Sequence, residues 1–345
     1  MSELPIWQYD SLLLILVLLF GITALAMQNL MGAAIVFGAY SFLMCLIWTT
    51  MGAVDVAFTE AAVGAGVSTV FIVSTIYNTG VSAIPKSPRI AFKIFASLIA
   101  IGTGAFLLSA LPDFPHWGDP KSPVNSIVAP YYIENSMKDA HVPNIVTTVL
   151  ADYRSFDTLL ETTVVFIACI AIYSILRIDN AKLKVTEPDI ITSPPAYDPT
   201  DSLIIRQASR IMVPFMQLFA LYVISHGHYS PGGGFQGGVI LAASIILLCI
   251  SFDLKYVLQY WTEKKIMLLT ALGVLIFALV GLACTLMGGE YLNYGMLDSV
   301  LPGDKAYARS HGILLVEIGV GMTVMFSMIG IYINLASNGR FDRGL

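Results

Sequence analysis

The amino-acid sequence predicts an all-α integral membrane protein with about nine transmembrane helices. Of its 345 residues, 57% are hydrophobic and 12% are charged, whereas charged residues make up about 25% of an average soluble domain. The mean hydropathy is +0.77. Nine apolar segments each have about 20 residues, the length that an α-helix needs to cross a bilayer. The basic residues between these segments also favour a single orientation in the membrane.

The nine segments follow one another with two polar interruptions. No basic region precedes the first segment and no small-residue cleavage site clearly follows it, so we expect a retained helix rather than a signal peptide. The first interruption covers residues 112–156. The second covers 179–202, and its central SPPAYDP predicts a linker between two modules. The expected helices cover residues 10–27, 29–50, 54–78, 90–111, 157–178, 204–225, 233–252, 266–288 and 311–336.

The positions of lysine and arginine predict how the chain is oriented. They cluster between the third and fourth segments, between the fifth and sixth, between the seventh and eighth, and after the ninth. With nine spans, all four clusters fall on one side, which the positive-inside rule assigns to the cytoplasm. We therefore expect the N-terminus outside and the C-terminus in the cytoplasm.

Charge and cysteine usage argue against two kinds of binding. The net charge is −5 and no run of basic residues occurs, so a nucleic-acid partner is not expected. The four cysteines each lie alone inside an apolar segment, without the spacing of a metal site or a disulfide framework. They are Cys45, Cys169, Cys249 and Cys284.

Five carboxylates lie within or at the ends of the apolar segments: Asp55, Glu60, Asp157, Glu161 and Glu317. A charge at the centre of a membrane helix costs about 2.5 to 3.5 kcal/mol on insertion scales, so these residues are functional candidates. In the nine-span topology Asp55 and Asp157 lie near the outer surface. Glu161 lies about 6 Å below Asp157, at a rise of about 1.5 Å per residue. We expect an outward-facing polar half-path for protons or cations, lined by Glu60, Glu161 and Glu317.

Each carboxylate also has a structural interpretation. Asp157 follows Ser155 at a helix start and could face the positive end of the helix dipole. Asp55 could be an interfacial carboxylate, and the glutamates could form hydrogen bonds between helices. Alanine recurs at every fourth position from 53 to 65, which favours close helix packing. This stripe predicts that Glu60 faces protein rather than lipid.

The stretch ISHGHYSPGGGFQGG at 224–238 raises the question of a ligand site. It contains G-x-G-x-x-G, but a dinucleotide site needs a preceding strand, and an apolar segment of helix length precedes it here. Two histidines two residues apart do not share a helix face, and zinc would need further ligands. The favoured interpretation is a tight outer turn, in which proline stops the helix and glycines allow close packing or unusual backbone angles. The candidate residues of this turn and of an outer ion vestibule are His226, His228, Pro231, Gly232, Gly233, Gly234, Phe235 and His311; no catalytic or metal-binding residue is predicted.

Three stretches resemble one family of membrane complexes. HGHYSPGGGFQGGVILAAS resembles the signature of the B subunit of Mrp-type (Mnh, Sha) multisubunit Na⁺/H⁺ antiporters, and this likeness extends over about 200–340. PNIVTTVLADYRSFDTLLETTVVFIACIAIYSILR resembles the C-terminal part of the large A subunit of these antiporters, which corresponds to the E subunit of membrane-bound hydrogenases. MGAVDVAFTEAAVGAGVSTVFIVSTI resembles the DUF4040 region, which is the hydrogenase D subunit.

The resemblance implies a natural fusion of these parts. The expected units are a hydrogenase D-like part at 1–82, an E-like part at 83–178 with the outer loop 112–156, the linker 179–202, and a B-like part at 203–345. It implies acidic family positions at Asp55, Glu60 and Glu161, and an effect of Pro231 and Phe235 on transport through the shape of the turn. The large antiporter portion of the A subunit, which carries the lysine and glutamate of the proton channel, has no counterpart in this sequence. We therefore do not expect transport by the chain alone.

The resemblance implies a membrane subunit of a monovalent cation/proton antiporter in the cell (inner) membrane. The subunit would be a transporter part rather than an enzyme, would bind no cofactor, and would contribute to the passage of H⁺ and Na⁺. The implied partners are large antiporter-like A- and D-type subunits and small C-, E-, F- and G-type subunits. Two alternatives are a subunit of a redox-driven complex of the hydrogenase, sulfur reductase or formate-linked type, and an accessory subunit of inorganic carbon uptake.

Overall fold

The structure is a computed structural model that describes residues 6–80, 90–116, 119–177 and 202–337. All regular secondary structure within these ranges is helical, and nine spans there are long and apolar enough to cross a membrane, which confirms the predicted fold. The predicted linker at 179–202 lies almost wholly outside the described residues. The spans are α1 (Ile6–Ala26), α2 (Leu30–Thr50), the continuous unit of α3 (Val54–Thr59), η1 (Glu60–Ser68) and α4 (Thr69–Thr79), α5 (Ile90–Ser109), α8 (Ser155–Leu176), α9 (Leu203–Ser225), α10 (Gly234–Phe252), α12 (Glu263–Leu286) and α13 (Lys305–Ala336).

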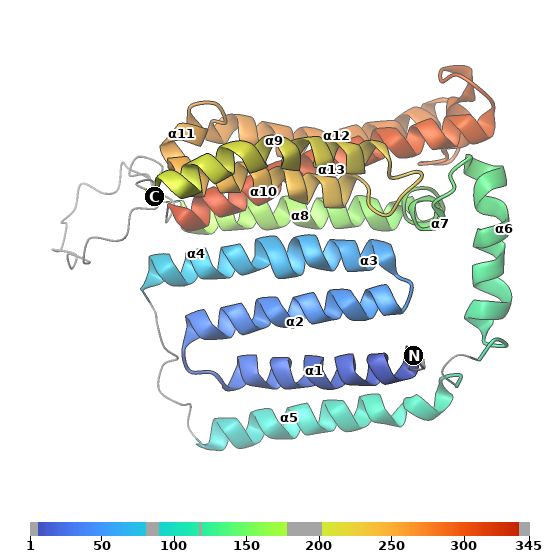
Figure 1. Cartoon of the computed structure of the whole chain (residues 1–345). Coiled ribbons are helices and arrows are strands. Elements are labelled where there is room, and N and C mark those ends of the chain that lie inside the picture. The colour runs from blue at the N-terminus through green and yellow to red at the C-terminus, as the bar shows by residue number, and fades with distance from the viewer. Residues whose placement is uncertain (1–5, 81–89, 117–118, 178–201, 338–345) are drawn as a thin grey trace, which may run out of the picture.

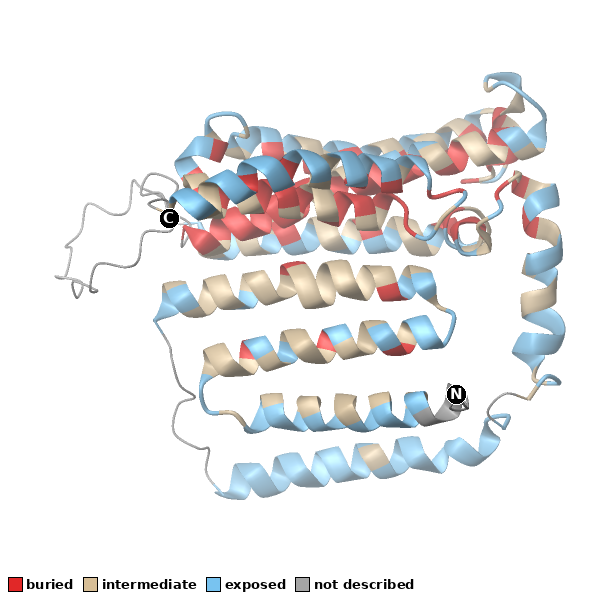
Figure 2. Ribbon diagram, viewed as in Figure 1, coloured by how far each residue is buried: buried red, intermediate tan, exposed pale blue. Residues whose placement is uncertain are grey.

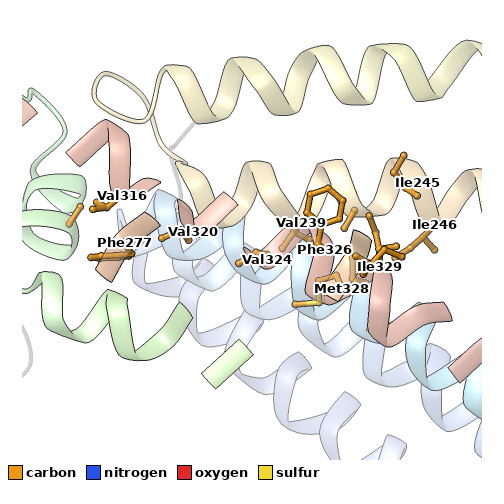
Figure 3. Packing of buried hydrophobic residues seen from close by; sticks show 14 of the residues in the cluster. Val239, Ile245, Ile246, Phe277, Val316, Val320, Val324, Phe326, Met328 and Ile329 are labelled. Carbon is orange, nitrogen blue, oxygen red and sulfur yellow. The ribbon is translucent and has the colours of Figure 1, made fainter. Parts of the chain in front are cut away.

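The spans lie side by side, and α13 is at the centre of the more densely packed half (Figure 1). It packs against α8, α10 and α12. Along its most apolar stretch 72% of the residues are buried, against 0% for α5, and Figure 2 shows the same contrast. Val316, Val320 and Val324 follow one another at a spacing of four, so they share one face of α13. Figure 3 shows this face among buried side chains that include Val239 of α10 and Phe277 of α12.

A buried hydrogen bond and an end contact fix α13 against its neighbours. The Thr323 hydroxyl donates to the carbonyl oxygen of Thr270 on α12 at 3.2 Å. At the C-terminal end of α13, the Asn78 amide of α4 donates to the carbonyl oxygens of Leu335 and Ala336 at 2.9 and 3.0 Å. Interhelical hydrogen bonds and close packing hold helices together in lipid, where apolar burial alone does not favour protein over lipid contacts.

The third span contains a π-helix that hydropathy does not reveal. The segment η1, with the sequence EAAVGAGVS, is π-helical over nine residues between two α-helical stretches. Its residues are as apolar and small as those of an α-helical span, so the sequence predicts one uninterrupted helix. Such π-segments occur frequently at functional sites.

The polar stretch 112–156 is largely helical, although the sequence predicts an outer loop. Its helix α6 crosses the ends of the spans and connects α5, at one edge of the row, to the segment that enters α8 (Figure 1). Asn144 caps the next helix by accepting from the amide of Val146 at 3.0 Å. The elements are η2 (Leu111–Asp113), η3 (Val124–Val128), α6 (Ala129–Ala140), α7 (Ile145–Thr148) and η4 (Val149–Tyr153); two further short helices, α11 (Leu254–Leu258) and η7 (Tyr294–Ser299), connect later spans.

Candidate functional site

A cavity of about 820 Å³ lies where α3, α8 and α10 begin, beside the middle of α13. It collects polar groups from regions far apart in the sequence. The start of α3, the stretch from α7 into α8, the turn before α10, and α13 all contribute to its wall. The side chains with polar or charged groups in the wall are Asp55, Thr59, Thr147, Arg154, Asp157, Thr158, Glu161, Thr162, Gln236 and Glu317.

Hydrogen bonds from two other regions hold the glycine-rich turn in place. The Thr147 hydroxyl donates to the carbonyl oxygen of Gly227 at 2.7 Å. The backbone amide of Asn144 donates to the carbonyl oxygen of His228 at 2.9 Å. On the other side, the amide of Gly232 donates to Oδ1 of Asp55 at 2.8 Å. Gly232 has a φ of 110°, one of the unusual backbone angles that the sequence predicts for this turn. The Asp55 carboxylate therefore anchors the turn.

A second contact ties α10 to α3 directly. The Gln236 amide donates to the Thr59 hydroxyl at 2.7 Å. Both residues line the cavity, so the first turn of α10 and the end of α3 form one continuous part of its wall.

Asp157 has its own partner at the start of α8. It accepts from Nε of Arg154 at 2.6 Å, and the side chain of Arg154 is mostly exposed. Asp157 also lies in the first turn of the helix, where a negative charge is stabilised by the helix dipole. Two of the four cavity carboxylates, Asp55 and Asp157, therefore accept hydrogen bonds. Glu161 and Glu317 line the cavity without a side-chain hydrogen bond to the described residues.

These two glutamates have opposite surroundings. Glu317 is buried, with 8% of its surface exposed, and its Oε2 has no hydrogen-bond partner among the described residues. A Cβ on Gly227 would lie 2.8 Å from Oε2, and a Cβ on Gly233 would lie 2.7 Å from Oε1. Only glycine fits at these positions without moving the carboxylate. Glu161 on α8 is exposed and lines the cavity.

Glu60, which the sequence groups with Glu161 and Glu317, lies elsewhere. A Cβ on Gly64 would lie 2.9 Å from the Glu60 carboxyl carbon and 3.0 Å from Oγ of Ser41 on α2. Thr59 lines the cavity, and consecutive residues of a helix point about 100° apart. Glu60 therefore faces α2, against protein as the alanine stripe predicts, and it is not part of the cavity wall.

The histidines of the predicted vestibule also lie outside the cavity wall. His228 is 6% exposed, and its Nε2 lies 2.9 Å from the carbonyl oxygen of Ser310, so this residue is buried against α13 and does not line an outer vestibule as predicted. Burial lowers its pKa, and the nearby His311 acts in the same direction. His226 is exposed and stacks on Tyr222. Pro231 is exposed, whereas Phe235 and the three glycines at 232–234 line the cavity as members of the turn.

Sequence reasoning missed the residues that position the turn. Asn144, Thr147 and Gln236 carry no charge, so the cost of burying a charge in a membrane does not single them out. Arg154 was visible only as one basic residue in a polar loop. Asn144 follows a proline and begins a short helix, which is a cap signal, but nothing in the sequence indicates that it also bonds the 227–230 turn.

Family models match three successive parts of the chain. Residues 15–81 match the D subunit of MBH, residues 93–188 match the E subunit of MBH, and residues 204–330 match a domain related to the MnhB subunit of Na⁺/H⁺ antiporters. The cavity wall includes residues from each of the three matched parts.

Two relatives named as antiporter subunits agree with these matches. The B subunit of the Na⁺/H⁺ antiporter of Bacillus subtilis is 32% identical over 132 residues, which are 36% of this chain and 92% of the relative. A probable A/B subunit of a K⁺/H⁺ antiporter from Rhizobium meliloti is 24% identical over 89% of this chain, which spans 32% of that relative.

Two solved membrane complexes contain similar chains. A chain of the Mrp complex from Dietzia sp. is 26% identical with a TM-score of 0.65; the match covers 93% of this chain and 34% of that one. A chain of the membrane-bound sulfane sulfur reductase, an archaeal respiratory membrane complex, is 25% identical with a TM-score of 0.51; the match covers 70% of this chain and 97% of that one.

Proposed function

The chain belongs to the Mrp/Mnh family of cation/proton antiporter subunits, with MBH D-like and E-like parts ahead of an MnhB-like part, and we propose that its cavity is one half of the ion path in the assembled complex. The chain itself is a multi-pass membrane protein and a transporter subunit. The cavity would pass H⁺ and a monovalent cation, for which we propose Na⁺. The positive-inside argument favours an opening to the outside of the cell (inner) membrane.

The observation that carries this proposal is that Glu161 and Glu317 face one cavity. Glu161 comes from the E-like part and Glu317 from the B-like part. Asp55 of the D-like part lines the same cavity and accepts a hydrogen bond from the turn before α10. Uncompensated carboxylates inside a membrane protein are costly and are typical of ion and proton pathways. Residues of all three parts are needed to form this cavity. We therefore favour an ion path over the alternative that the three carboxylates have separate structural roles.

Further subunits are needed for a complete path. The cavity occupies only one end of the spans, and at the other end an ion pair of 2.6 Å joins Arg177 of α8 to Glu263 of α12. We propose large A- and D-type antiporter subunits and small C-, E-, F- and G-type subunits as the partners that supply the second half.

The substitution Glu161→Gln tests the proposal in membrane vesicles that contain the assembled complex. Loss of a charged contact costs about 1.5 to 3 kcal/mol, so the apparent KM for Na⁺ in Na⁺-dependent pH changes should rise about 10- to 100-fold. Glu134→Gln, an exposed position on α6 outside the cavity wall, is the matched control. Parental transport by a normally assembled Glu161→Gln complex would exclude this cavity as the path.

A redox-driven complex is the second candidate, because the sulfane sulfur reductase chain is similar over 97% of its length and two of the family models are MBH subunits. The purified complex in vesicles distinguishes the two. An antiporter exchanges Na⁺ for H⁺ when only a pH gradient is imposed. A redox-driven pump would move ions only when an electron donor and acceptor are supplied.

A further inference from the structure

We propose that the two cavity glutamates handle different ions: Glu317 exchanges protons only, and Glu161 is the site of the metal cation. This rests on the proposed function and adds which ion each residue binds. It follows from the contrast between a buried carboxylate with few oxygen ligands around it and an exposed carboxylate in the same cavity.

The surroundings of Glu317 offer few oxygen ligands for a metal cation. Hard cations in proteins need several oxygen ligands. The carbonyl oxygen of Gly227 already accepts from Thr147 and Asn144, and that of Gly233 accepts from the amide of Gly237. The cavity wall next to Glu317 on its own helix is formed by Val316 and Val320, which have no side-chain oxygen.

The N-terminus of α10 also acts against a metal cation at this place. Gly233 is the N-cap of α10 and lies against the Glu317 carboxylate. The first amides of a helix have no partner within it and carry partial positive charge. They repel a metal cation but support a carboxylate that has lost its proton.

Proton exchange at Glu317 needs no further ligand. Cavity water transfers a proton to the Glu317 carboxylate, the group becomes a neutral carboxylic acid, and the proton later returns to water. An enclosed position suits the neutral form because it has no charge to solvate. The other charged or titratable groups around Glu317 lie on α3, at the residue before α8 and on the first turns of α8, in the turn before α10, and on α13 itself. They are Asp55, Arg154, Asp157, Glu161, His228 and His311.

The surroundings of Glu161 suit a metal cation. Its side chain is exposed on the first turns of α8, so a cation can bind there while keeping part of its water shell. The Thr158 and Thr162 hydroxyls near it donate to backbone carbonyls, so each oxygen can still accept or ligate, and both residues line the cavity.

Carbodiimide labelling of the assembled parental complex tests, without any substitution, whether the two glutamates bind different ions. A hydrophobic carbodiimide reacts with protonated carboxyl groups in membrane proteins, and peptide mass spectrometry reports each site. We expect labelling at Glu317 that falls as pH rises and does not change when NaCl replaces choline chloride. At Glu161, we expect NaCl to protect against labelling. Protection of Glu317 by Na⁺, or no labelling of Glu317 at any pH, would overturn the proposal.

The substitution Glu317→Gln supplies the second readout. The transport rate should fall about 100-fold, the usual effect of losing a proton-transfer group, while the Na⁺ concentration that half-protects Glu161 stays at the parental value. If this Na⁺ concentration shifts, Glu317 takes part in Na⁺ binding. That result would overturn the assignment of separate ions to the two glutamates and would leave the proposed ion path intact. Parental transport by a normally assembled Glu161→Gln complex would instead overturn the proposed function itself.

Discussion

At the scale of single residues, the glycines around Glu317 explain why the turn before α10 is so rich in this residue. Gly227 and Gly233 have no room for a Cβ because the Glu317 carboxylate occupies the space. Gly232 has the positive φ that lets its amide reach Asp55. The glycines therefore serve a carboxylate of the same chain, and the resemblance to a nucleotide-binding motif is a coincidence of spacing.

Gly233→Ala is expected to displace the carboxylate and weaken the fold. The new Cβ would lie 2.7 Å from Oε1 of Glu317, and overpacking of this kind costs about 1 to 3 kcal/mol. The melting temperature in detergent should fall, together with transport. Gly102→Ala on α5 is the matched control, because nothing lies within 4 Å of its Cβ position. Equal melting temperatures and transport rates of the two variants would contradict crowding between Gly233 and the Glu317 carboxylate.

At the scale of elements, the sequence predicts those structural features that depend only on residues near each other in the chain. Span length and hydropathy depend only on neighbouring residues, so all nine spans are predicted. The cost of a charge in lipid likewise singles out Asp55, Asp157, Glu161 and Glu317. The π-helix, the helices of 112–156 and the true direction of Glu60 depend on which helix packs alongside. A single sequence does not contain that information.

An ion pair connects η4 of the E-like part to α13 of the B-like part. Asp152 of η4 accepts from Arg309 of α13 at 3.1 Å, and 5% of its side chain is exposed. Burial raises the pKa of Asp152, and the Arg309 guanidinium opposes this by favouring the ionised form. A buried carboxylate that loses such a partner is costly, whereas removing both charges is much less so.

We therefore expect Arg309→Gln to destabilise the protein more than the double variant Arg309→Gln with Asp152→Asn. Loss of the charged hydrogen bond costs about 1.5 to 3 kcal/mol, and part of this should return in the double variant because the unpaired charge is gone. Melting temperatures of the parent, both single variants and the double variant in one detergent form the cycle. Additive effects would mean that the two side chains do not interact.

At the scale of the whole molecule, the three family-related parts are joined at both ends of the spans. Near the cavity, the turn of the B-like part bonds Asp55 of the D-like part and Thr147 of the E-like part. At the opposite end, Asn78 of the D-like part bonds the last turn of α13. These contacts do not depend on the covalent connection between residues 177 and 202, so the parts should recognise each other as separate chains.

A chain divided between residues 178 and 203 should accordingly reassemble when both pieces are produced together. The expected result is that an affinity tag on the C-terminal piece retains the N-terminal piece in mild detergent, because the contacts of Asp55, Thr147, Asp152 and Asn78 all cross the division. The double variant Asp55→Ala with Thr147→Val removes two of the side chains that hold the turn, so the amount retained should fall. Glu134→Gln, which lies on the exposed surface of α6, should leave it unchanged. If the divided pieces purify apart even with all contacts present, the parts are held together by their covalent connection rather than by the cavity they share.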